Sequence, residues 1–349
     1  MSQDEASPGV LMAAEIAEQP AIWRRVLAGR DAIAQVASTL ATRQPRFVLL
    51  VARGTSDHAA LYAKYLVEIV LGLPAGLASP STLTAYGARP DLRDVLMIGV
   101  SQSGGSPDLV ESLRVGREQG AQTLAVTNNA ESPLARAAEL HLDVLAGPER
   151  AVAATKSYTA QLLTLYLLLD AARGGGGAAA SRLPDWGEQL VGHGDRLVDA
   201  AQRYRFAQRL VVTGRGYSYS TAREAALKLM ETSYLSAQAF SGADLLHGPM
   251  AMVDPQVPVL AVMAHGVGGH ALRQVLPRLR DARADVFCVG SADAVAEATL
   301  GVALPDGVPE EVSPILEILP FQQLALHLAV ARGENPDAPR GLRKVTETL

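Results

Sequence analysis

The sequence contains one cysteine, no cluster of basic residues and no paired histidines, and each shortage excludes a feature or a kind of partner. Cys288 is the only cysteine among 349 residues, so no disulfide can form within one chain. Lysine and arginine do not gather over several helical turns, and the net charge is −5, so we expect no nucleic-acid partner. None of the seven histidines forms an H-x-x-x-H pair, so we expect no metal site.

Signals for secretion and for a membrane span are also missing. The N-terminus "MSQDEASPG" is polar and acidic, unlike a signal peptide. The apolar stretch 157–172 carries Thr159, Gln161 and Thr164, which is typical of a buried helix rather than of a membrane span. We therefore expect a cytoplasmic protein that does not bind a membrane.

Short apolar runs alternate with helical patterns along the chain, which predicts an α/β fold. The runs 46–54, 94–104 and 121–129 show no polar alternation, and a helical pattern follows each of the first two. Strands of this kind form parallel sheets that are covered on both faces. The layout of 47–68 returns in 209–231, so the chain carries one α/β unit twice.

We predict two doubly wound lobes, each with three α/β/α layers. Four consecutive glycines after Arg173 disfavour regular structure and indicate a linker. The predicted segments are an N-terminal helical segment at 1–30, a first lobe at 31–172, a Gly-rich linker at 173–195, a second lobe at 196–332 and a C-terminal tail at 333–349.

The stretch "SQSGGSPD", 101–108, places hydroxyl side chains and glycines between a buried strand and a helix. Ligands of open α/β sheets bind at this position, where free amides and the helix dipole favour an anion. The alternative is a polar turn, because helix N-caps are also rich in serine. The stretch is neither G-x-G-x-x-G nor a Walker motif, so an anion bound here would be smaller than a dinucleotide.

A second informative stretch, 224–254, combines Lys228, Glu231 and His247. Lys228 and Glu231 are three residues apart, so they share one face of a helix whose flanking residues are apolar. The ordinary interpretation is a surface ion pair, and a single histidine is more often structural than catalytic. The three residues together also fit an acid–base site.

Several motifs resemble those of the sugar isomerase (SIS) domain family, and within it the isomerase half of glucosamine-6-phosphate synthases. They are "RGTSDH" at 53–58, "SQSGGSPD", "AVAATKSYTAQ" at 151–161, "ALKLME" at 226–231, "LLHGPM" at 245–250 and "PRGLRKVTETL" at 339–349. The resemblance covers nearly the whole chain. It departs from the family's pattern at Gly105, where the family has an acidic residue, and at Ala154, where it has serine.

The resemblance implies a site for a sugar phosphate, with no cofactor and no metal. The phosphate would be bound by Ser101, Gln102, Ser103 and Ser106. Sugar hydroxyls would be bound by the "RGTS" turn, with Thr55 and Ser56, and by the backbone of Val152.

The same resemblance implies catalytic roles for four residues. Glu231 would move a proton between C1 and C2, and Lys228 would assist. His247 would help to open the sugar ring, from its own chain or from a partner subunit. Lys344 would react with, or lie beside, the carbonyl carbon.

The resemblance favours a glucosamine-6-phosphate deaminase that releases fructose 6-phosphate and ammonia. The sequence shows no glutaminase domain, so we do not expect a glutamine-dependent amidotransferase. One alternative is a fructosamine-6-phosphate deglycase or another phosphosugar isomerase. Another is a phosphosugar-binding regulator, although the chain lacks a basic DNA-binding segment.

Two further expectations concern a partner subunit and the tail. The apolar face of 157–172 is wider than one lobe can cover, so we expect a homodimer. The tail contains Pro336 and Pro339, which disfavour a helix, and Leu342 and Val345 are the apolar residues that could anchor it. We expect the tail to fold over the site and deliver Lys344.

Overall fold

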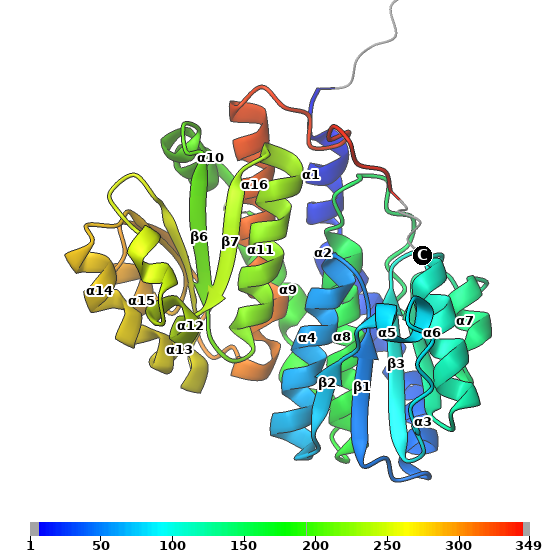
Figure 1. The fold of residues 1–349 in the computed structure, drawn as a ribbon. Coiled ribbons are helices and arrows are strands. Elements are labelled where there is room, and N and C mark those ends of the chain that lie inside the picture. Colours follow the sequence, from blue (N-terminus) through cyan, green and yellow to red (C-terminus); the bar gives the residue numbers. More distant parts are fainter. Residues whose placement is uncertain (1–6, 193, 345–349) are drawn as a thin grey trace, which may run out of the picture. The chain divides into compact units, whose positions relative to one another are not determined.

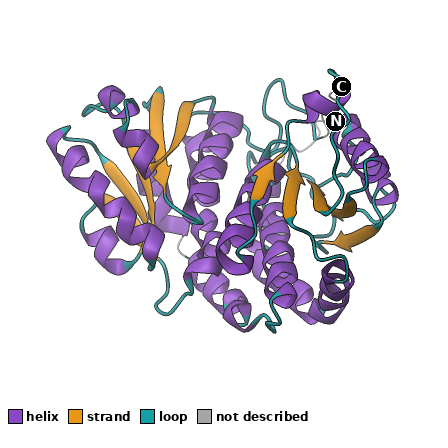
Figure 2. Cartoon of the chain, turned by 60° about the horizontal axis from the view of Figure 1, so that its bottom comes forward, coloured by secondary structure: helices purple, strands orange, loops and turns teal. Residues whose placement is uncertain are grey.

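The computed structural model describes residues 7–192 and 194–344, and it confirms the predicted α/β fold. Two five-stranded parallel sheets lie in the described chain, each with helices packed against it (Figure 1). Figure 2 shows the strands in orange and the helices in purple in a turned view.

The first sheet has the strand order β2-β1-β3-β4-β5. Its strands are rich in valine, leucine and isoleucine, and every residue of β4 is buried, as expected for a sheet covered on both faces. The bounds are β1 (Phe47–Val51), β2 (Ala75–Leu77), β3 (Val95–Ser101), β4 (Gln122–Thr127) and β5 (Leu140–Asp143).

Two groups of helices accompany this sheet. The first group contains α3 (Arg30–Ala41), α4 (Thr55–Leu66), the π-helix η1 (Val67–Leu71) and α8 (Lys156–Ala172), with α3 and α4 packed on α8. The second group contains α5 (Pro80–Thr84), α6 (Pro107–Glu118) and α7 (Pro133–Ala137), with α5 and α7 packed on α6.

The helix predicted at 157–172 is confirmed as α8, but its apolar face is no evidence for a partner. Every residue from Lys156 to Asp170 is buried within the single chain. The chain itself therefore covers this helix, and its apolar face leaves no surface that requires a partner subunit. The homodimer stays a prediction.

The second sheet has the order β10-β9-β8-β6-β7 and repeats the first. When the strands are counted from the start of each repeat, both sheets have the order 2-1-3-4-5. In this doubly wound order the strand sequence reverses between the first and third strands, and ligands bind at that switch point. The bounds are β6 (Arg209–Gly214), β7 (Ser236–Ser241), β8 (Val259–Met263), β9 (Val286–Gly290) and β10 (Leu300–Ala303).

The long helices α11 (Ser218–Ser233) and α16 (Ser313–Ala331) pack on each other beside the second sheet. Shorter helices complete this region of the fold: α9 (Leu183–Val191), α10 (Gly194–Tyr204), α12 (Gly242–Leu246), α13 (Val267–Leu272), α14 (Leu276–Asp281) and α15 (Ala292–Ala296). The remaining elements are the N-terminal helices α1 (Val10–Ala17) and α2 (Gln19–Ala28) and the 3-10 turns η2 (Ala178–Ala180), η3 (Pro249–Met252), η4 (Arg273–Val275) and η5 (Glu310–Val312).

The chain divides into two compact units. The first unit holds Ala21–Glu149 and Lys156–Ser181, and the second holds the chain up to Pro20, Arg150–Thr155 and Arg182–Lys344. The predicted linker at 173–195 is too long, because helix α9 occupies part of it. Pro184 begins this helix and Trp186 is buried, so the irregular stretch is limited to the glycine run and its neighbours.

Helix α16 passes through the interior of the second unit. Glu310–Ala331 is long and apolar enough to cross a membrane, with a mean hydropathy of 1.3. Its most apolar window is 83% buried inside the fold, which is typical of a core helix.

A buried carboxyl group on α16 joins it to α11. Glu317 accepts hydrogen bonds from Ser218 at 2.8 Å, Thr221 at 2.7 Å and Ser313 at 2.7 Å. Burial raises the pKa of Glu317 above its ordinary 4.5, and the three hydroxyl donors oppose that rise only in part. Glu317 therefore keeps its proton to a higher pH in the folded protein than in the unfolded chain.

This proton predicts a pH dependence of stability. Above pH 4.5 the folded state binds more protons than the unfolded state, so the free energy of unfolding falls as the pH rises towards the folded pKa. Glu317→Gln keeps the shape without the titration, so it should flatten the decline. Urea unfolding of both proteins at pH 5 and pH 8 measures the difference, and parallel declines would contradict the assignment to Glu317.

Candidate functional site

The predicted anion loop follows β3 in the first unit and turns on glycine. Ser101 Oγ accepts a hydrogen bond from the amide of Gly104 at 3.0 Å. Gly104 has φ 64°, and a Cβ there would lie 2.3 Å from Ser132 Oγ. Glycine is required here because both the backbone conformation and the close contact exclude a side chain.

Two serine hydroxyls of this loop are not used for helix capping. Ser106 is the N-cap of α6, but its side chain makes no capping hydrogen bond. Ser103 Oγ accepts from the amide of Gly105 at 3.2 Å, which leaves its own proton to donate. A polar turn of the ordinary kind would use its N-cap serine on the helix, so the geometry favours a loop that binds a ligand.

The neighbouring loop, after β1, carries Thr55 and Ser56. Gly54 precedes them with φ 54°, and α4 begins at Thr55. Ser56 is buried, and its Oγ accepts a hydrogen bond from Gln161 Nε2 at 3.1 Å. Because β1 pairs directly with β3, the two loops leave the same edge of the sheet on neighbouring strands.

An ion pair that the sequence did not reveal joins these two loops. Arg53 donates from Nε and Nη2 to Asp108 Oδ2, both at 2.8 Å. Asp108 is buried in the first turn of α6, and its other oxygen accepts from the amide of Leu109. Both residues stand in the quoted motifs, but their spacing of 55 residues carried no signal of pairing.

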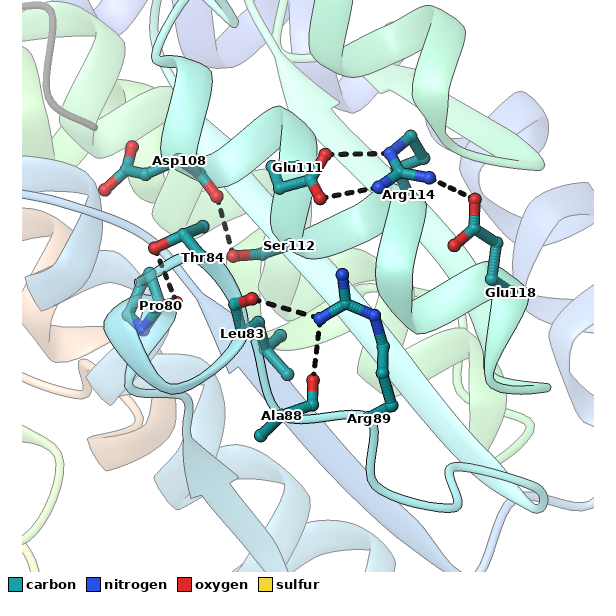
Figure 3. Close-up of polar contacts among 10 residues, drawn as sticks. All are labelled: Pro80, Leu83, Thr84, Ala88, Arg89, Asp108, Glu111, Ser112, Arg114 and Glu118. Atoms are coloured by element: carbon teal, nitrogen blue, oxygen red, sulfur yellow. Dashed lines mark hydrogen bonds and ion pairs between the residues drawn. The ribbon is translucent and has the colours of Figure 1, made fainter. Parts of the chain in front are cut away.

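Asp108 is separate from the charged outer face of α6. Figure 3 shows Glu111, Arg114 and Glu118 paired along that face, while the Asp108 carboxylate points away from them. Arg114 holds the pKa of Glu111 below its ordinary value through its hydrogen bonds. These exposed pairs contribute little to stability and take no part in the loop.

The second unit contains the predicted ionisable residues of α11. Lys228 is fully buried, and its Nζ lies 2.5 Å from Glu231 Oε2 and 3.4 Å from Glu224 Oε1. Glu224 is also fully buried, whereas the Glu231 side chain is 22% exposed. The surface-pair interpretation is therefore wrong, and Glu231 is the member of the cluster that a ligand can reach.

Glu224 was missed by the sequence analysis. Its position four residues before Lys228 was a sufficient signal, since residues four apart share a helix face. The buried Lys228 ammonium group lies close to two carboxylates, so it lowers the electrostatic cost of burying each of them. In a single ion pair it would do this for one carboxylate.

The structure brings Lys344 to Val152 but does not join His247 to the α11 cluster. Lys344 Nζ donates to the backbone carbonyl of Ala151 at 2.7 Å, next to Val152. Glu15 supports this segment by accepting from the amides of Arg150 and Ala151. His247 is exposed after α12, and within 7–192 and 194–344 no hydrogen bond or ion pair links its side chain to Glu231.

The loop after β8 corresponds in the second repeat to the serine-rich loop after β3, and it differs in one respect. Glu310 accepts from the amides of Val267 at 2.9 Å and Gly268 at 2.7 Å. A carboxylate of the chain itself thus occupies the backbone donors there. Metal binding has no support in the described residues, where no group of three suitable side chains is found.

Both repeats of the chain match one known domain family. Residues 43–171 and 204–332 match the SIS domain. The glutamine–fructose-6-phosphate aminotransferase (isomerizing) of Gloeobacter violaceus is 36% identical over 95% of this chain and 58% of its own length. The chain therefore spans a little over half the length of that relative.

Two solved structures are similar in fold. A candidate phosphosugar isomerase from Silicibacter pomeroyi is 34% identical, with a TM-score of 0.85 over 94% of this chain and 99% of its own. A glucosamine-6-phosphate deaminase from Thermotoga maritima is 22% identical, with a TM-score of 0.73 over 97% of this chain and 100% of its own. The second similarity shows the fold alone.

The buried cluster predicts that one substitution strongly lowers the stability and that a second substitution restores part of it. Lys228→Met removes the ammonium group and leaves Glu224 buried without its charge partner, which should cost about 3–5 kcal/mol of unfolding free energy. Adding Glu224→Gln should recover part of that loss. Urea unfolding of the single and double variants measures both effects, and an unchanged stability of Lys228→Met would contradict the cluster.

Proposed function

Because the chain belongs to the SIS domain family in both of its repeats, we propose that it is a phosphosugar isomerase that deaminates glucosamine 6-phosphate. The products are fructose 6-phosphate and ammonia, and water is the second reactant. The substrate class is supported by the name of the aminotransferase, which acts on fructose 6-phosphate, and by that of the candidate phosphosugar isomerase.

The observation that carries the proposal is the ion pair between Glu231 and the buried Lys228. A carboxylate that is partly exposed and fixed by a buried ammonium group can take a proton from carbon and return it to the neighbouring carbon. Lys228 holds the Glu231 carboxylate in place. Glu224 also lies beside the Lys228 ammonium group, with Oε1 at 3.4 Å from Nζ.

The proposed reaction has two steps, a proton transfer and a hydrolysis. Glu231 takes the proton from C2 of the open-chain amino sugar and delivers it to C1, and one proton of the amine passes to O1. The aldehyde thereby becomes a hydroxymethyl group and the amine becomes an imine. Water then adds to C2, and ammonia leaves as the ketone forms. No oxidant or reductant is consumed.

The remaining residues bind and prepare the substrate in this proposal. Ser101, Gln102, Ser103 and Ser106 bind the phosphate, while Thr55, Ser56 and the backbone of Val152 bind sugar hydroxyls. His247 assists ring opening, and Lys344 acts beside the carbonyl carbon. A homodimer and a cytoplasmic location accompany the proposal as predictions.

A second candidate, a fructosamine-6-phosphate deglycase, is favoured by the loop itself. Gly105 places no acidic side chain beside the hydroxyls of Ser103 and Ser106, and the segment after Val152 has Ala154 where the family has serine. Both changes remove a polar side chain that the family's pattern has, so this chain need not share the substrate of that pattern.

Substrate turnover with a base variant tests the function. Glucosamine 6-phosphate should yield ammonia and fructose 6-phosphate in equal amounts. Turnover of fructosamine 6-phosphate, with no turnover of glucosamine 6-phosphate, would favour the deglycase. Glu231→Gln should lower turnover by about a hundredfold to ten-thousandfold while substrate still binds. Glu118→Gln, on the outer face of α6, is the matched control and should retain full activity. Near-normal turnover of Glu231→Gln would remove this residue from the mechanism.

The role of the loop is tested by comparing a phosphorylated and a neutral sugar. Ser103→Ala removes one donor to a charged group, which contributes roughly 1.5–3 kcal/mol. Glucosamine 6-phosphate should therefore bind at least tenfold more weakly, while the weak binding of glucosamine should change little. Calorimetric titration measures both, with Ser38→Ala on α3 as the control. Equal losses for the two sugars would show that the loop does not bind phosphate.

A further inference from the structure

The tail after α16 is held by hydrogen bonds and buried prolines within the second unit, and Leu342 is not its anchor. Asp337 accepts hydrogen bonds from the amides of Leu11 at 3.0 Å and Met12 at 2.8 Å, at the start of α1. Pro336 and Pro339 are buried. Leu342, which the sequence suggested as an anchor, is 42% exposed, and Val345 lies outside the described residues.

Between these contacts and Lys344, the tail meets one aromatic ring. The Arg340 guanidinium lies 4.0 Å from the centre of the Tyr234 ring. The backbone amide of Arg340 also donates to the Tyr234 hydroxyl at 2.8 Å. One tyrosine therefore binds the same tail residue through its ring face and through its hydroxyl, and a cation over an aromatic face is an attractive contact.

Tyr234 occupies a position where glycine is the usual residue. It ends α11 in the left-handed conformation, with φ 53° and ψ 33°. A side chain costs conformational energy there, and glycine would supply neither a ring nor a hydroxyl to the tail. Tyr234 also follows Glu231 by three residues, so the end of one helix carries both the base and the support for the tail.

We propose that Tyr234 is a positioning residue that docks the tail through Arg340 and thereby places Lys344 at the Ala151 carbonyl. The catalytic part of this inference rests on the proposed function. Lys344 lies four positions after Arg340, a stretch that spans up to about 14 Å when extended. Without the anchor at Arg340, the Lys344 amine can occupy a wide volume, and its contact with Ala151 is made less often.

Activity measurements on a double-mutant cycle test the coupling between Tyr234 and Lys344. Tyr234→Leu should lower kcat/KM by roughly threefold to thirtyfold, the range expected for a cation–aromatic contact. Tyr234→Phe keeps the ring and should lose less, and Arg343→Ala, in the same tail, should lose nothing. In a Lys344→Ala background, Tyr234→Leu should add no further loss. Additive losses would show that Tyr234 acts through another residue and would overturn the proposal.

Tail docking is also measured without any substrate. Brief trypsin digestion, followed by mass spectrometry, reports cleavage after Arg343 and Lys344. Tyr234→Leu should be cleaved several times faster than the original protein, with Tyr234→Phe between them. Arg340→Gln replaces Tyr234→Leu if the latter has a lowered melting temperature. An unchanged cleavage rate overturns the docking, whereas faster cleavage with no turnover of any amino-sugar phosphate overturns the proposed function alone.

Discussion

The placement of the two candidate ligand loops depends on the parallel pairing of β1 with β3. Successive strands of a parallel sheet end at the same edge, and the order 2-1-3-4-5 sends the connections from these two strands to opposite faces. The loops that carry Ser56 and Ser103 therefore start side by side and then separate. The Arg53–Asp108 ion pair bridges them where they begin to diverge. A lone carboxylate in the first turn of α6 would repel a phosphate, and Arg53 compensates that charge.

The second repeat has the same strand order but uses the corresponding edge differently. Glu310 occupies the amides of Val267 and Gly268, so the chain provides its own anion there. The ionisable cluster of this unit lies instead on α11, a helix long enough to bury Glu224 and Lys228 and still expose part of Glu231. In the proposed function, the first copy of the fold binds an external anion and the second supplies acid–base groups.

The parallel-sheet fold and the shared helix face of Lys228 and Glu231 were predictable from the sequence, because both depend on local patterns. Unbroken apolar runs followed by helices indicate a parallel sheet, and the Lys228–Glu231 spacing defines a shared face. Contacts between distant segments were not predictable. Arg53 with Asp108, Arg340 with Tyr234 and Glu310 with Gly268 are each set by packing of whole elements. The linker was overestimated for a related reason, since the glycines of 174–177 are a strong local signal while burial of Trp186 is a tertiary one.

The cluster on α11 depends on the regular spacing of residues along the helix. Positions 224, 228 and 231 lie on one stripe only while the helix keeps its 3.6 residues per turn, and each added or removed residue rotates the remainder of the helix by about 100°. A single insertion between Glu224 and Glu231 would turn one carboxylate away from Lys228 and leave the lysine paired with the other alone. The loops after β1 and β3 have no such periodic constraint. Changes of length during divergence should therefore be absent from 224–231 and gather elsewhere in the chain.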